Sequence, residues 1–203
     1  MSPKTTPKVR AVSKKHYPHV KDLPLDKFFE LCEAFLEERR WDLSLIAYDF
    51  AYRKRKHYRL DTYDVFESWL YKYVNDWGDC DDFTTHAFGY LIHDFPELSQ
   101  RIISWTKHEK FAVRRAAATV LIIPIKKQNE SIISPFVISD LLMHDHHYLV
   151  LKGYGWMLKI YLSTHFDDVI EYLKRHEIAM PRISFRYAIE KLNQEEKKKY
   201  FNL

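Results

Sequence analysis

The strongest constraint on the fold is a helix-start signal that recurs at nearly even spacing. Capping, acidic or proline residues precede stripes of helical period at five places, 35, 35, 38 and 33 residues apart: Asp26, Asp61, Pro96, Ser134 and Asp167. Each interval has room for a second helix. A period near 35 with two helices per period predicts stacked antiparallel helix pairs. We therefore expect an all-α chain that forms an α-solenoid, as a single domain over residues 1–203.

Glycine is scarce, and this excludes several other architectures. Only four of the 203 residues are glycine, whereas roughly 7% is usual. So few glycines argue against the tight hairpins of all-β folds and against the glycine-rich phosphate loops of dinucleotide-binding and P-loop enzymes. The tetratricopeptide consensus is missing, so the period favours HEAT-like repeats, an α-α superhelix.

The repeat pattern assigns each helix to one of two sets. First helices are expected at 26–38, 61–74, 97–106, 136–143 and 167–175. Second helices are expected at 41–56, 81–94, 109–126, 147–164 and 182–192. Residues 7–16 form a basic helical pattern that resembles a second helix without its first. We therefore expect the repeats to begin half a repeat late.

Basic residues gather on the second helices. They outnumber acidic residues by 32 to 28, which gives a formal charge of +4. Several share a helix face, being separated by four or seven positions: Lys110 and Arg114, Lys152 and Lys159, Arg182 and Arg186. Stacked second helices would align these side chains as a positive wall, which suits contacts with phosphates. Ile183, Tyr187 and Leu192 are expected to face the core instead.

The segment 75–89 carries the most chemistry. Four carboxylates, Asp76, Asp79, Asp81 and Asp82, surround Trp77 at the entrance to a second helix. Capping and complementation of the helix dipole explain one or two of them. The alternative is a carboxylate set among basic residues that stabilises a cation or orients water.

Two glycines, Gly153 and Gly155, lie inside one expected helix. Each lowers the stability of the helix by about 1 kcal/mol relative to alanine, so their presence there calls for a structural reason. Close packing or access to a site would supply it. Trp156 follows them and is either a core anchor or an exposed aromatic wall. The alanine-rich face after Arg114 and Arg115 also predicts close helix packing.

Other reactive side chains give weaker signals. Two cysteines, Cys32 and Cys80, make neither a disulfide framework nor a four-ligand zinc site. Acidic neighbours would raise the pKa of the Cys80 thiol and lower its reactivity. The run 144–147 (HDHH) lacks the spacing of a helical zinc motif, so we expect a polar loop and no metal site. There is no apolar leader at the N-terminus, and the longest apolar stretch, 116–125, is too short to span a bilayer. A cytoplasmic protein without membrane association is expected.

Four segments in order resemble the AlkD-like DNA alkylation repair glycosylases, which are built from HEAT-like repeats. The resemblance runs from about residue 6 to residue 201. Trp77 with Asp81 matches the family's tryptophan and the acid four residues later. FAVRRAAATV (111–120) is similar to its arginine-pair segment, with Phe111 in place of tryptophan, and LKGYGWMLK (151–159) to its glycine–tryptophan segment. MPRISFRYAIEKL (180–192) matches the C-terminal segment most closely.

The resemblance implies removal of N3- or N7-alkylated purines from duplex DNA, by a monomer without metal or nucleotide cofactor. Asp81 would be the catalytic carboxylate, Trp77 and Trp156 the aromatic walls beside the lesion, and Arg115 a contact to the DNA backbone. The basic side chains of the second helices would bind further phosphates: Lys110, Arg114, Lys152, Lys159, Arg182 and Arg186.

The chain departs from the family pattern at three points. Gly78 replaces the acid that follows the first tryptophan, with Asp79 as a substitute. Lys159 with Ile160 replaces an arginine–glutamate pair, so we expect that ion pair to be lost. The family's first helices, with an aromatic residue for the DNA cleft, have no counterpart. These departures motivate an alternative, a non-catalytic helical-repeat protein that binds DNA or protein. A general protein scaffold fits less well with Asp81 and Trp156.

Overall fold

The computed structural model describes residues 5–201, and the regular structure in that range is helical. The α-helices are α1 (Thr6–His16), α2 (Leu25–Glu37), α3 (Trp41–Lys54), α4 (Thr62–Tyr73), α5 (Trp77–Phe83), α6 (Gly89–Asp94), α7 (Phe111–Thr119), α8 (Ile122–Lys126), α9 (Pro135–Leu142), α10 (Tyr148–Leu162), α11 (Phe166–Arg175), α12 (Arg182–Ala188) and α13 (Gln194–Phe201). The 3₁₀ helices are η1 (Tyr17–His19), η2 (Arg55–His57) and η4 (Pro96–Lys107), and η3 (Thr84–Phe88) is a π-helix.

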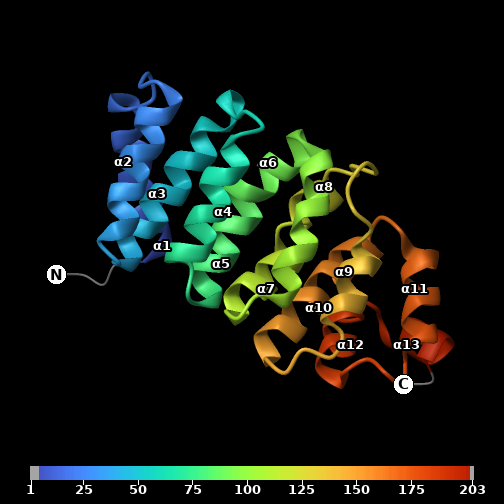
Figure 1. Ribbon diagram of the computed structural model, residues 1–203. Coiled ribbons are helices and arrows are strands. Elements are labelled where there is room, and N and C mark those ends of the chain that lie inside the picture. Colours follow the sequence, from blue (N-terminus) through green and yellow to red (C-terminus); the bar gives the residue numbers. More distant parts are fainter. Residues whose placement is uncertain (1–4, 202–203) are drawn as a thin grey trace.

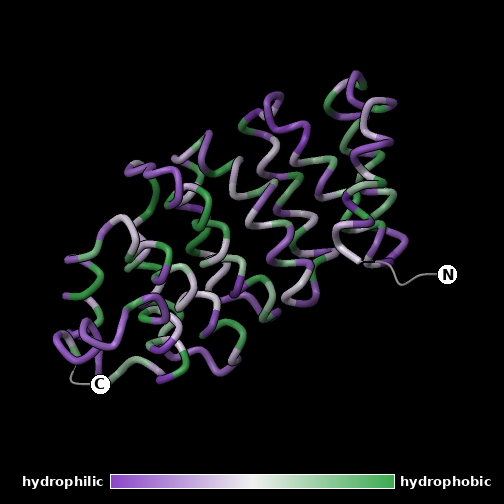
Figure 2. The backbone as a smooth tube through the Cα atoms, turned by 180° about the vertical axis from the view of Figure 1, so that it is seen from behind, coloured by the Kyte–Doolittle hydropathy of each residue, from purple (hydrophilic) through white to green (hydrophobic). Residues whose placement is uncertain are grey.

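The helices stack as pairs that follow the chain from one end of the molecule to the other (Figure 1). The second helices form a continuous layer, because α3 contacts α5, α5 contacts α7, α7 contacts α10 and α10 contacts α12. Seen from behind, polar residues concentrate at the turns that connect the helices (Figure 2). The expected α-solenoid is confirmed.

Aromatic side chains fill the space between the two layers. Phe66 is fully buried, and its ring centroid lies 5.3 Å from that of Trp69, 5.2 Å from that of Phe83 and 5.5 Å from that of Phe88. Such edge-on and tilted pairs add about 0.5–1.5 kcal/mol each beyond the area that they bury. Most of the aromatic content of the chain therefore serves the core.

One expected first helix has a different geometry. Residues 96–107 form the 3₁₀ helix η4, an unusual length for this helix type. Ser99, Ile102 and Trp105 are buried at intervals of three residues. Three residues per turn put these side chains on one line facing the core, whereas an α-helix would rotate them apart.

Two expected second helices are interrupted. The segment 81–94 passes through the π-helix η3, where the hydroxyl of Thr84 donates to the carbonyl of Cys80 and that of Thr85 to the carbonyl of Asp81, both at 2.7 Å. Hydroxyls that take the i−4 carbonyl compete with the helix backbone. The segment 109–126 divides into α7 and α8 because Pro124 cannot donate to the carbonyl four residues earlier.

Helix α1 packs along α3, as expected of a second helix. It buries Val9 and Ser13, one turn apart. Within residues 5–201, every helix is too short or too polar to cross a membrane.

Candidate active site

A cleft of about 600 Å³ opens between the second helices α5, α7, α10 and α12. Its lining is made of acidic, basic and aromatic side chains: Trp77, Asp81, Arg115, Tyr148, Leu149, Lys152, Trp156, Lys159 and Tyr187. The four residues expected to converge on one groove, Trp77, Asp81, Arg115 and Trp156, therefore lie around the same cleft.

Asp81 and Arg115 form a two-pronged ion pair at the floor of the cleft. The Nε and Nη2 atoms of Arg115 each donate to a different oxygen of the Asp81 carboxylate, both at 2.8 Å. Nη1 donates to the carbonyl oxygen of Leu149. Burial works against the charged guanidinium, but the hydrogen bonds and the charge of Asp81 outweigh it and raise the pKa of Arg115. Arg115 thus fixes the orientation of the carboxylate.

This geometry changes the role expected for Arg115. The side chain of Arg115 is only 7% exposed, and its donors are engaged inside the protein. A contact to the DNA backbone does not fit this position. We therefore assign Arg115 to the positioning of Asp81, whose side chain is 20% exposed on the open side of the pair.

Gly153 makes room for the Arg115 side chain. A Cβ atom at Gly153 would lie 3.1 Å from Cγ and 3.3 Å from Nη1 of Arg115. That is tighter than ordinary van der Waals contact, so even alanine would press on the arginine. Close packing of α10 against the Arg115–Asp81 ion pair therefore offsets the helix stability that is lost at Gly153.

Aromatic rings form the walls of the cleft. Trp77 is 52% exposed, and Trp156 is half-buried against the core with one side on the cleft. Tyr148, which is 56% exposed, begins α10 as Trp77 begins α5. An aromatic residue at the start of both helices is the sequence signal that could have identified Tyr148 as part of the cleft. Tyr187, expected in the core, lies instead at the edge of the cleft and is half-buried.

Of the six basic residues expected to bind further phosphates, Lys152 and Lys159 line the cleft. The Nζ atom of Lys152 lies 5.5 Å from the ring centroid of Tyr148 and 5.8 Å from that of Tyr187. Lys159 lies 5.0 Å from the ring of Tyr187 and forms an ion pair with Glu190 at 2.5 Å. The arginine–glutamate pair expected to be lost at 159–160 is thus replaced by a different ion pair, because the turn after α12 brings Glu190 to Lys159.

The other basic residues lie outside the cleft lining. Arg114 binds Asp145 at 2.6 Å and donates to two carbonyl oxygens of the preceding turn. Lys110 donates to the carbonyl of Tyr71 at 2.6 Å and to Asn75. Both are engaged in joining the helix pairs, which argues against the DNA contacts expected of them. Arg182 and Arg186 are exposed on α12.

The four acids of α5 and its cap have separate surroundings. Asp76 accepts a hydrogen bond from the backbone of Trp77 at 2.7 Å, so the capping interpretation holds for it. Asp81 faces the cleft, and Asp82 pairs with Arg10. Asp79 lines a separate hollow of about 310 Å³ beside Trp41. Asp79 is therefore not placed to act in the cleft beside Asp81.

Burial, reinforced by the charges of Asp76 and Asp82, raises the pKa of Asp79 to about 6. Between the ordinary pKa near 4 and this value, the unfolded chain loses the proton while the folded chain keeps it, so stability falls as pH rises. We expect Asp79→Asn to raise the free energy of unfolding by about 1 kcal/mol at pH 7.5, a figure reduced for the partial exposure of the group. At pH 4 the two proteins should be equally stable. Urea unfolding at both pH values measures this, and equal stability at pH 7.5 would contradict it.

The remaining reactive groups lie apart from the cleft or are buried. Burial, and secondarily Asp81, raises the pKa of the Cys80 thiol to about 12. In the expected polar loop, Asp145 is held by Arg114, and the His147 ring stacks on Phe111 at 3.9 Å. Among residues 5–201, no three histidine, cysteine or acidic side chains are grouped to hold a metal ion.

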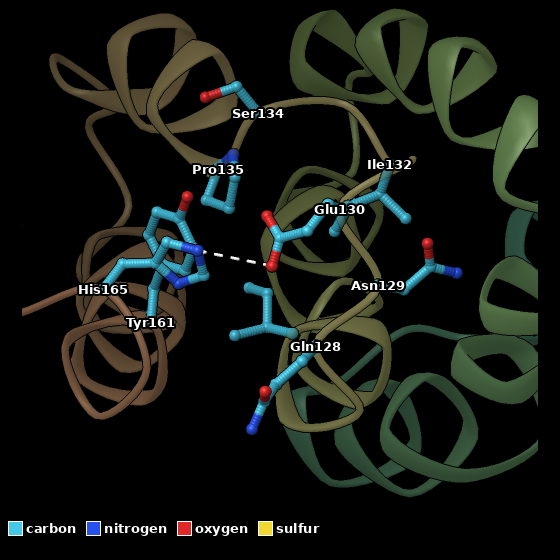
Figure 3. Close-up of a pocket in the computed structure, with 9 residues that line it drawn as sticks. Gln128, Asn129, Glu130, Ile132, Ser134, Pro135, Tyr161 and His165 are labelled. Atoms are coloured by element: carbon cyan, nitrogen blue, oxygen red, sulfur yellow. Dashed lines mark ion pairs between the residues drawn. The ribbon is translucent and has the colours of Figure 1, made fainter. Parts of the chain in front are cut away.

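A smaller hollow of about 140 Å³ lies between the loop after α8 and the end of α10 (Figure 3). Glu130 and His165 face each other across it at 3.3 Å, and the His165 ring lies tilted against that of Tyr161 with centroids 4.2 Å apart. The side chain of Asn129 donates to the carbonyl of His93. These contacts fasten the loop to the helices, so we assign the hollow a structural role.

Comparison with known proteins gives a consistent result. The family model described as "DNA alkylation repair enzyme" matches residues 4–192. One solved structure, a "Predicted DNA alkylation repair enzyme from Enterococcus faecalis", superposes with a TM-score of 0.77 over 94% of this chain and 87% of that one. The two sequences are 20% identical, so this likeness shows the fold. A comparison with curated proteins gave no match.

Proposed function

The chain belongs to the DNA alkylation repair enzyme family, and on this basis we propose that it hydrolyses the N-glycosidic bond of cationic N3- or N7-alkylated purines in duplex DNA. The observation that carries this proposal is the Asp81 carboxylate, oriented by Arg115 in an open cleft with aromatic walls. We propose that it acts as a monomer, as the resemblance implies.

Hydrolysis of this glycosidic bond requires from the protein mainly one negative charge in a fixed position. Alkylation at N3 or N7 makes the purine cationic and a good leaving group. When the C1′–N bond breaks, the sugar develops oxocarbenium character, which a nearby carboxylate stabilises. Asp81 would provide that charge and orient the water that attacks C1′. Arg115 keeps the carboxylate from rotating as charge develops, so no reorganisation is needed during the reaction.

The aromatic walls suit a positively charged lesion. The faces of Trp77 and Trp156 would attract the cationic base and the developing charge on the sugar, an effect of about 0.5–2 kcal/mol per contact. The cleft is open rather than a closed pocket around one base. It therefore does not require the target nucleotide to be fully extruded from the duplex.

Basic side chains near the cleft would hold the DNA backbone. Lys152 lies at its wall, and the exposed Arg182 and Arg186 extend the positive surface along α12. Each phosphate contact releases counterions, so binding should weaken steeply as salt increases. Lys110, Arg114, Arg115 and Lys159 are left out of this interface because internal partners engage them.

The test is the release of free 7-methylguanine from an N7-methylated duplex, measured by chromatography after incubation with the protein. Release above the spontaneous rate is expected, with none from an unmethylated duplex. Tighter binding to the methylated duplex without release would overturn the proposal and favour a non-catalytic DNA-binding relative. Binding that does not change between 50 and 200 mM salt would contradict the phosphate contacts.

A further inference from the structure

The N-terminal helix α1 reaches past its neighbour α3 to the helix that carries Asp81. The guanidinium of Arg10 on α1 forms an ion pair with Asp82 on α5. The same guanidinium lies 3.4 Å from Asp49 on α3 and 3.4 Å from Nε2 of His86 in η3. One arginine thus joins three successive second helices, and the side chain that it holds is the immediate neighbour of Asp81.

The surroundings show a built, enclosed network. Asp49 is 3% exposed and accepts hydrogen bonds from Ser13 at 2.5 Å and from Arg53 at 2.7 Å. Asp82 is 17% exposed in its side chain. At such low exposure a carboxylate without a partner is strongly disfavoured, so the ionised form of Asp82 depends on Arg10.

Helix α5 depends on side-chain contacts for its orientation, because its regular α-helical hydrogen bonding ends at Phe83, directly after Asp81 and Asp82, where the π-helix η3 begins. The Thr85 hydroxyl takes the carbonyl of Asp81, and Nδ1 of His86 lies 2.9 Å from the carbonyl of Asp82. The α-helical ladder therefore does not continue past the site. Two arginines from opposite sides fix α5 instead, Arg115 through Asp81 and Arg10 through Asp82.

We propose that Arg10 is a positioning residue for Asp81: by holding Asp82, it keeps α5 in the orientation that pairs Asp81 with Arg115. This inference rests on the proposed function for its catalytic meaning, but the coupling that it describes is a property of the folded protein. It also gives a role to α1, which packs on α3 as a second helix does.

The inference has a distinctive dependence on pH. The groups that face Asp82 are Arg10 on α1, His86 in η3, Asp49 and Tyr48 on α3 and, on its own helix, Asp79. Burial raises the pKa of Asp82, and Arg10 and His86 hold it down. Without Arg10 the pKa rises further. Asp82 is then neutral and tolerated at low pH, but it becomes an unpaired buried charge as pH increases.

The experiment is a titration from pH 5 to 8.5 that follows the Nε–H NMR signal of Arg115 in the full chain. In Arg10→Gln this signal should shift with the ionisation of Asp82, whereas in the native protein and in Arg10→Gln/Asp82→Asn it should not. Release of 7-methylguanine by Arg10→Gln should fall about tenfold as pH rises through that transition. The double variant should recover to within about twofold of the native rate. Arg59→Gln, which removes an exposed arginine that also bridges two helices, is the matched control.

If the Arg115 Nε–H signal of Arg10→Gln does not shift as Asp82 ionises, the inference is overturned, whether or not base release changes. A double variant that stays as impaired as Arg10→Gln would also overturn it, because Arg10 would then act by another route. If the native protein releases no base but the NMR coupling is present, the positioning role stands and the proposed glycosylase function fails.

Discussion

Asp81→Asn is expected to lower the rate of 7-methylguanine release by about 10²- to 10³-fold, the loss typical of removing one preorganised electrostatic group. The amide matches the carboxylate in shape but is neutral, so it cannot stabilise an oxocarbenium-like sugar. It also offers only one acceptor to Arg115, which now makes two hydrogen bonds to the carboxylate. The affinity for unmodified duplex should change little, because the phosphate contacts come from other residues.

The matched control is Asp79→Asn, which makes the same chemical change two residues earlier on α5. Asp79 lines a different hollow, so its substitution should leave base release within about twofold of the native rate. Single-turnover kinetics on an N7-methylated duplex, with circular dichroism to check the fold, separate the two variants. Equal rates for Asp81→Asn and the native protein would remove Asp81 from the mechanism.

The fold was predictable because its signals are local. Helical periodicity and start residues such as Pro96 and Ser134 need no knowledge of distant contacts. The deviations arise where side chains meet across the stack. Every third residue of η4 is buried because Ile102 and Trp105 must both face the core. The π-helix η3 forms where threonine hydroxyls donate to backbone carbonyls. Pro124, by contrast, was a readable signal for the break in α7–α8.

The residues of the candidate site were predictable, but their partners were not. The resemblance to the family singled out Trp77, Asp81 and Trp156, and the solenoid brings α5 and α10 to one cleft with α7 between them. Whether an arginine points to DNA or to an internal carboxylate depends on distances between repeats. Arg114 and Arg115 are adjacent in sequence, yet one holds Asp145 and the other holds Asp81. The Asp82–Arg10 pair spans 72 residues and leaves no local pattern.

Gly155 on α10 packs tightly against α12, which carries Tyr187 at the edge of the cleft. A Cβ atom at Gly155 would stand 2.7 Å from the carbonyl oxygen of Ser184 and 2.8 Å from Cβ of Tyr187. These atoms belong to or adjoin the backbone of α12, so they cannot move aside as a flexible side chain would. Gly155→Ala must therefore push α12 away from α10 and carry Tyr187 out of the cleft.

We expect Gly155→Ala to lower the free energy of unfolding by about 2 kcal/mol, since overpacking of this kind costs about 1–3 kcal/mol and outweighs the helix propensity gained. Base release should fall about tenfold, because Tyr187 no longer flanks Lys152 and Lys159. Gly78→Ala is the matched control: beyond its chain neighbours and its own helix, no heavy atom lies within 4 Å of the added Cβ, so stability should not fall and should rise by up to about 1 kcal/mol. Thermal unfolding and base-release assays on both variants check this. Equal stability of the two variants would mean that α12 does not pack on α10 as closely as the structure places it, and that the wall of the cleft formed by Tyr187 is not fixed.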